Sequence, residues 1–276
     1  MQIKTLKTFI VLSLLAAAVA AFFFFNTGMR IKRHFYGVAP GVTLENRDVS
    51  RWLEDEVEAY VLKRAEELKV EPRNAFFDRS SGDILPEVKG RFVNIRSTVA
   101  SVMGAEKNSP IDLALIYVDP EITRELLESL TVEIGSFITY IGGGGSGRVE
   151  NIRLATEVFN YRLVAPGQTL SFNKTTGPTT AEKGYKLAPI IVGGRIVDGL
   201  GGGICQVSTT LFNAVDEAGL QVVERYQHSK PVGYVAKGRD ATVSHHLDFK
   251  FRNNTNKYIL IKAWTDYRIN FTILTH

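Results

Sequence analysis

The sequence predicts an α+β protein in three parts: an N-terminal transmembrane helix, a small α+β module, and an α+β domain with a cysteine-bearing helix on a largely antiparallel sheet. Three observations predict this fold class. An apolar run opens the chain, helical and strand-like patterns mix in the middle, and alternating apolar residues fill the C-terminal third. The expected parts are residues 1–36, residues 37–140 and residues 141–276.

The first part has the composition of a membrane anchor. Residues 9–25 are uninterruptedly apolar or small, and basic residues flank this run on both sides, namely Lys4, Lys7, Arg30, Lys32 and Arg33. Cleavage after Ala20, as in a signal peptide, would leave Phe22 to Phe25 at the new N-terminus. We therefore expect an uncleaved anchor in the cell membrane, crossing once, with the bulk of the chain extracytoplasmic. The basic flanks by themselves do not decide the orientation.

The second part combines amphipathic helices with short strands. Apolar residues recur at helical spacing, separated by Glu and Lys, from Arg51 to Lys69. Further helices are predicted over Ile95–Met103 and Pro120–Leu130, and strands over Asn74–Asp78 and Ile111–Val118. Reactive side chains do not cluster there, so a spacer or docking role is the simpler interpretation.

The third part begins after a glycine-rich connector at residues 141–148, which lacks the Lys-Ser/Thr of a phosphate-binding loop. Helices are predicted over Asn151–Tyr161 and Gln206–Ala218. Two strands are expected around the turn Gly193-Gly194, and the remaining strands lie after the second helix. The predicted strands are Ala188–Val192, Arg195–Val197, Gln221–Tyr226, Val232–Ala236, Ala241–Arg252, Tyr258–Asp266 and Arg268–Leu274.

Charge and cysteine content narrow the function. The net charge of +4 and the pI near 9.0 suit work beside an anionic surface such as cell-wall polymer or lipid headgroups. Basic residues are scattered among acidic ones, so no nucleic-acid partner is expected. The single cysteine cannot form an intramolecular disulfide, and the Cys and His spacings match no zinc motif. We therefore expect neither a metal nor a cofactor.

That cysteine, Cys205, follows a glycine run and precedes the second helix. A thiol at a helix N-terminus lies in the positive end of the macrodipole, which favours the reactive thiolate. The backbone amides around it could bind an oxyanion, and the expected donors are Gly202, Gly203, Ile204 and Gln206. A small buried residue in a tight turn is the competing interpretation.

A cysteine nucleophile needs a base, and three histidines follow it. Strand alternation from Ala241 places His245 on the apolar face and His246 on the polar face. His228 lies in a loop at a strand end, where a ring can be presented to a substrate, so it is the predicted base. Asp240 would orient the ring by accepting its Nδ1–H, although it could equally cap a loop.

Several motifs resemble one known family, the VanW domain. They are PGQTLSFN, TGP, GYKLAP, GLGGGICQVSTTLFNA, ERYQHS, GRDATV and DFKFRNNT, in order from about Arg148 to Ala263. Residues 41–130 more loosely resemble the peptidoglycan-binding-like domain that often precedes VanW in anchored bacterial proteins. Two positions depart from the family pattern: Ala236 replaces a common proline, and Ser244-His245-His246 replaces a small or aromatic pair.

The resemblance implies work on the bacterial cell wall. The family takes its name from glycopeptide-resistance gene clusters and has been linked to L,D-transpeptidase activity through its motif cysteine, which here is Cys205, with His228 in the His-Ser motif. The implied substrates are peptidoglycan stem tetrapeptides, held through a thioester. We expect the substrate-binding residues to be Ser208, Thr209, Tyr234 and Arg239. The alternatives are a non-catalytic peptidoglycan-binding or scaffold protein, and a cysteine endopeptidase, amidase or carboxypeptidase on stem peptides.

Overall fold

A computed structural model describes residues 2–192 and 195–276, but not the side chains of residues 2–13, 16, 191 and 192. The chain divides into two compact units. Unit 1 comprises residues 1–74 and 87–121, and unit 2 comprises residues 75–86 and 122–276. The predicted turn Gly193-Gly194 lies outside the described residues.

Unit 1 is a small α+β structure with its own apolar core. Its helices are α1 (Gln2–Tyr36), α2 (Glu54–Leu68) and α3 (Ile95–Met103), and its strands are β1 (Thr43–Leu44), β2 (Arg47–Asp48), β5 (Gly90–Val93), β6 (Pro110–Ile111) and β7 (Leu115–Val118). Val57 and Val61 of α2 are fully buried against Val99 and Val102 of α3. Asn94 caps α3 by accepting from the Ser97 amide.

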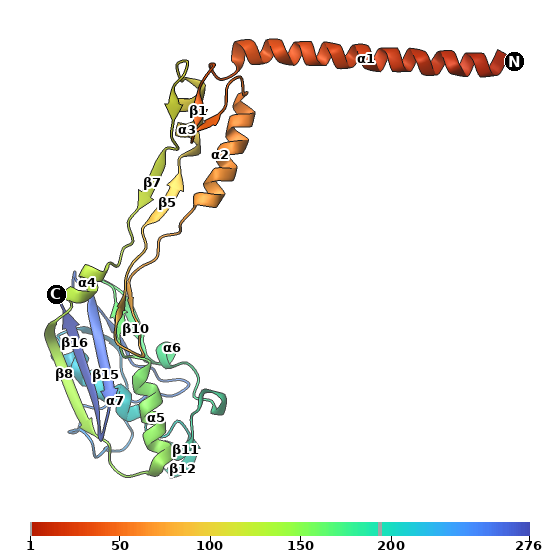
Figure 1. Cartoon of the computed structure of the whole chain (residues 1–276). Coiled ribbons are helices and arrows are strands. Elements are labelled where there is room, and N and C mark those ends of the chain that lie inside the picture. The colour runs from red at the N-terminus through yellow and green to blue at the C-terminus, as the bar shows by residue number, and fades with distance from the viewer. Residues whose placement is uncertain (1, 193–194) are drawn as a thin grey trace. The chain divides into compact units, whose positions relative to one another are not determined.

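The main sheet of unit 2 is antiparallel, with strand order β8-β16-β15-β9 (Figure 1). Its strands are β8 (Val132–Tyr140), β9 (Arg162–Val164), β15 (Ile259–Thr265) and β16 (Arg268–Thr275). Helix α7 (Ile204–Glu217) packs on β8 and β16, and α5 (Gly145–Glu157) packs on β15 and on α7. Gly135 of β8 permits this close approach, because a Cβ there would lie 2.5 Å from the Ala214 oxygen.

Smaller elements surround this sheet. A second antiparallel sheet has the order β10-β14-β13, β11 pairs with β12, and β3 pairs with β4. Their bounds are β3 (Phe76–Phe77), β4 (Ile84–Leu85), β10 (Thr169–Ser171), β11 (Leu187–Val192), β12 (Arg195–Leu200), β13 (Gln221–Glu224) and β14 (Lys250–Arg252), with short helices α4 (Arg124–Ser129), α6 (Phe172–Thr176) and η1 (Ala181–Lys183). Between the two sheets lies a core of buried aliphatic and aromatic residues, among them Phe159, Phe172, Phe249 and Phe271.

The α+β class and the cysteine helix on an antiparallel sheet are confirmed, whereas three finer predictions are not. Residues 2–36 are helical, yet within the described residues no helix is long and apolar enough to cross a membrane. The predicted strand Val232–Ala236 is irregular, and Ala241–Arg252 forms a strand only at Lys250–Arg252.

Candidate functional site

Cys205 is the second residue of α7, as the glycine run before it predicts. Gly203, the residue before the helix, has φ 106°, which favours glycine. A Cβ on Gly202 would lie 2.7 Å from the Pro189 oxygen, and one on Gly203 would lie 2.9 Å from Ile152. The glycines therefore let the start of α7 press against β11 and α5.

The first turn of α7 offers fewer free amides than predicted. The Ile204 amide donates to the Gly201 oxygen (3.2 Å), and the Gln206 amide donates to the Gly203 oxygen (2.9 Å). The Cys205 amide makes no hydrogen bond to any described residue, as is usual in the first turn of a helix. Of these three helical amides, the amide of Cys205 itself is the one available to an oxyanion.

The sulfur of Cys205 is held as a thiol. It donates a hydrogen bond to the Val243 oxygen at 3.4 Å. Burial raises the pKa of the Cys205 thiol; the bond to Val243 opposes this effect and the negative charge of Asp240 adds to it. Burial therefore acts against the thiolate that the helix dipole is expected to favour. Deprotonation requires a base.

His228 and Asp240 form a pair, as the motifs predict. The Asp240 carboxylate accepts the His228 backbone amide, and the same oxygen lies 2.6 Å from His228 Nδ1. Both side chains are only 10% exposed. Burial opposes ionisation of Asp240, but the bonds from the His228 amide and ring hold its pKa below the usual value. With Nδ1 occupied, Nε2 is the ring nitrogen left for proton transfer.

A hollow of about 280 Å³ lies beside this pair, lined by the loop between β13 and β14 from Gln227 to Asp240. Among the described residues, no hydrogen bond joins His228 to the Cys205 sulfur, whose partner is Val243. Asp240 nevertheless acts electrostatically on that sulfur, because its negative charge adds to the rise in the pKa of Cys205.

Ser208 and Thr209 are fully buried, and their hydroxyls form hydrogen bonds with the backbone of Ala241, the residue that follows Asp240. The Ser208 hydroxyl donates to the Ala241 oxygen at 2.6 Å. Thr209 Oγ1 accepts the Ala241 amide at 2.9 Å and lies 3.3 Å from the Ala241 oxygen. One turn further on, Asn213 Nδ2 donates to the Arg239 oxygen. These contacts position the loop and leave Ser208 engaged with backbone instead of facing a substrate.

Tyr234 lies among the polar groups of the site. Burial raises the pKa of the Tyr234 hydroxyl, the negative charge of Asp240 adds to this effect, and the Thr209 side chain opposes it. Arg148, on the first turn of α5, is its positively charged neighbour. Sequence reasoning missed Arg148, whose only distinguishing sign is its place at the end of a glycine run.

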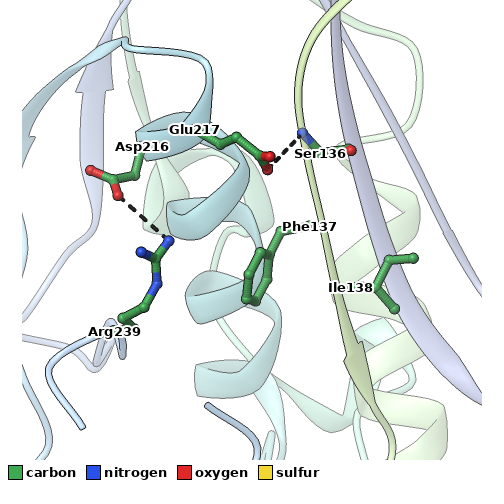
Figure 2. A pocket seen from close by; sticks show the side chains of 6 residues that line it. All are labelled: Ser136, Phe137, Ile138, Asp216, Glu217 and Arg239. Atoms are coloured by element: carbon green, nitrogen blue, oxygen red, sulfur yellow. Dashed lines mark hydrogen bonds and ion pairs between the residues drawn. The ribbon is translucent and has the colours of Figure 1, made fainter. Parts of the chain in front are cut away.

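Arg239 lies away from the start of α7. Its Nε donates to Asn213 Oδ1 at 2.5 Å, and its guanidinium pairs with Asp216 at 3.5 Å. Figure 2 shows it pointing toward Asp216 in an open hollow of about 570 Å³ beside Phe137. This hollow lies at the last turns of α7, so Arg239 is not brought together with Cys205.

His245 and His246 are both exposed. Exposure was expected of His246, whereas the prediction that His245 belongs to the core is wrong. The Ser244 amide donates to the Leu247 oxygen, and the Ser244 hydroxyl accepts the Leu247 amide, so a turn replaces the strand. The turn faces both rings toward solvent.

Fold and site together define an α+β domain that presents one cysteine at a helix start, beside a buried His-Asp pair. Residues 147–274 match the family model described as VanW like protein, which confirms the resemblance of this part of the chain to the VanW domain. Uncharacterized protein YoaR of Bacillus subtilis is 48% identical over 157 residues, which are 56% of this chain and 52% of that protein.

A second relative is the Vancomycin B-type resistance protein VanW of Enterococcus faecalis. It is 32% identical over 115 residues, covering 40% of this chain and 42% of that protein. The chain thus spans about half the length of the curated relatives it matches. No solved structure matches it.

Proposed function

We propose that the VanW-like domain is a cysteine acyltransferase, an L,D-transpeptidase that acts on peptidoglycan stem tetrapeptides. The observation that carries the proposal is the His228–Asp240 pair within electrostatic range of a thiol at a helix start. The name of the E. faecalis relative, a vancomycin resistance protein, supports a role in the cell wall. The reaction would take place outside the cytoplasm. Protease treatment of intact cells tests this placement, because a chain outside the cytoplasm should be cleaved.

The proposed reaction has two steps. In the first, the Cys205 sulfur bonds to the carbonyl carbon of the third residue while its proton passes to His228 Nε2. The amide C–N bond breaks, the terminal D-residue leaves as an amine with that proton, and a thioester remains. In the second, an amine from a neighbouring stem attacks the thioester, forming a new amide and restoring the thiol.

The raised pKa of Cys205 shapes this mechanism. A resting thiol must lose its proton during the attack, so catalysis depends on His228 exchanging places with the Val243 oxygen as the partner of the sulfur. The Cys205 amide would stabilise the oxyanion. Asp240 would keep the His228 ring in the tautomer that accepts a proton at Nε2.

The test is mass spectrometry of muropeptides after incubation with the full chain. Wild type should release terminal D-alanine and form cross-linked dimers, while Cys205→Ala should form neither. Circular dichroism should show an unchanged fold, because the substitution removes little volume and costs about 1 kcal/mol. Product formation by the Ala variant would refute the mechanism. Free tripeptide without dimers would indicate a carboxypeptidase, and cleaved fragments would indicate an endopeptidase or amidase.

The raised pKa of the thiol favours a second candidate, a non-catalytic peptidoglycan-binding protein in which the half-buried Cys205 has a structural role. This candidate predicts equal retention of wild type and Cys205→Ala on purified peptidoglycan, with no product from either.

A further inference from the structure

Arg148 enters the site from the first turn of α5. Its side chain lies against the glycines that precede α7, since a Cβ on Gly203 would lie 3.0 Å from Arg148 Cγ. Its Nη2 donates to Gln206 Oε1 at 2.5 Å. Gln206 is held in turn, because its Nε2 donates to the Tyr140 oxygen at 2.8 Å and to Thr139 Oγ1 at 3.0 Å. The guanidinium is therefore fixed beside the residue that follows Cys205.

Among the described residues, Arg148 has no carboxylate as an ion-pair partner. Nη1 is buried and has no hydrogen-bond partner among the described residues. Burial lowers the pKa of Arg148, and the one charge that opposes this effect is that of Tyr234, a group that is neutral at neutral pH. A buried guanidinium N–H without a partner costs free energy unless an anion joins it.

Arg153, on the same helix, provides the contrast. It forms ion pairs with both Glu150 and Glu157. Among the described residues, carboxylates thus pair with one arginine of α5 and not with the other, which donates to Gln206, the residue after the cysteine. Planar guanidinium groups bind carboxylates through two parallel hydrogen bonds, and Gln206 leaves Nη1 free for such a contact.

We propose that Arg148 binds the C-terminal carboxylate of the donor peptide, one residue beyond the bond that Cys205 attacks. This inference rests on the proposed function for the identity of the peptide. It makes the domain selective for stems whose chain ends at the residue after the scissile bond.

Binding to the inactive Cys205→Ala full chain tests the inference without catalysis. The probes are a stem tetrapeptide ending in D-alanine and the same peptide with a C-terminal amide, titrated by calorimetry. Charge-assisted hydrogen bonds contribute about 1.5–3 kcal/mol, so the carboxylate form should bind at least about tenfold more tightly. Adding Arg148→Gln should reduce this ratio to about one. Arg153→Gln is the matched control, which removes an equal charge from α5 and should keep the ratio.

The amide probe retains the internal carboxylate of the stem, so it separates that source of negative charge from the terminus. A lost ratio with Arg148→Gln alone supports the inference, even if wild type forms no product and the transferase proposal fails. Equal binding of both probes to Cys205→Ala, or an unchanged ratio with Arg148→Gln, overturns it while leaving the transferase proposal to its own test. Absence of binding by either probe at millimolar concentration also overturns it.

Discussion

Thr209 offers a test of how α7 holds the loop that carries Asp240. Its hydroxyl is the hydrogen-bond partner of the Ala241 amide at 2.9 Å, and both residues are fully buried. Thr209→Val keeps the side-chain volume but leaves that N–H unpaired, which costs about 1–3 kcal/mol. In a unit of this size, each kcal/mol lowers the melting temperature by about 2–4 °C, so a loss of roughly 2–12 °C is expected.

Thr156→Val is the matched control. Thr156 is equally buried, but its hydroxyl only donates to the Ile152 oxygen within α5 at 2.8 Å. Its replacement orphans no backbone donor and should cost less than about 1 kcal/mol. Thermal melts by circular dichroism compare the two variants, and hydrogen exchange of the Ala241 amide reports the site directly. Equal melting temperatures for both variants, with the Ala241 amide still protected from hydrogen exchange, would refute the role of the Thr209 hydroxyl in holding the Ala241 backbone.

Two further predictions concern the thiol and the glycine run. Because burial and Asp240 raise the pKa of Cys205, alkylation by iodoacetamide should be slow at pH 7 and should rise through a midpoint above the ordinary pKa of a cysteine thiol. Asp240→Asn should speed alkylation at pH 7 yet slow turnover. Asp248→Asn is the control, because the Asp248 carboxylate is bonded to Ser171, and it should leave alkylation unchanged. An unaltered alkylation rate in Asp240→Asn would contradict the electrostatic effect of Asp240 on the thiol. Gly203→Ala, at φ 106°, should lower the free energy of unfolding in urea by about 1–3 kcal/mol. Gly142→Ala is the control, because open space surrounds Gly142, and it should be nearly neutral. Similar losses in both variants would argue against close packing at Gly203.

The helices were predictable because their local signals agree with their packing. The amphipathic spacing of Glu54–Leu68 and the Asn94 cap of α3 both act within a few residues. Strand β8 was missed because its inward positions include Gly135 and Thr139, which interrupt the apolar alternation. Gly135 is required by the approach of α7, a contact that no local pattern reveals.

The segment from Ala241 to Phe249 shows the opposite failure. Its apolar alternation predicts a strand, but side chains from elsewhere take its backbone groups: Thr209 binds Ala241, and Asn173 donates to the oxygens of Ser244 and Leu247. In the site, the His228–Asp240 pair was predictable from residue types. The raised pKa of Cys205 was not, because it follows from burial of the thiol in the fold, with the charge of Asp240 adding to this effect.

The attachment of Ala241 to Ser208 and Thr209 has a mechanical consequence. Cys205 belongs to α7, and the segment that carries Asp240 is hydrogen-bonded to α7 about one helical turn further on. A rotation or slide of α7 over the sheet would carry them together as one piece. Mutations that repack the face of α7 that lies on the sheet should therefore move Cys205 and Asp240 together relative to a substrate, while the distance between these two residues is preserved.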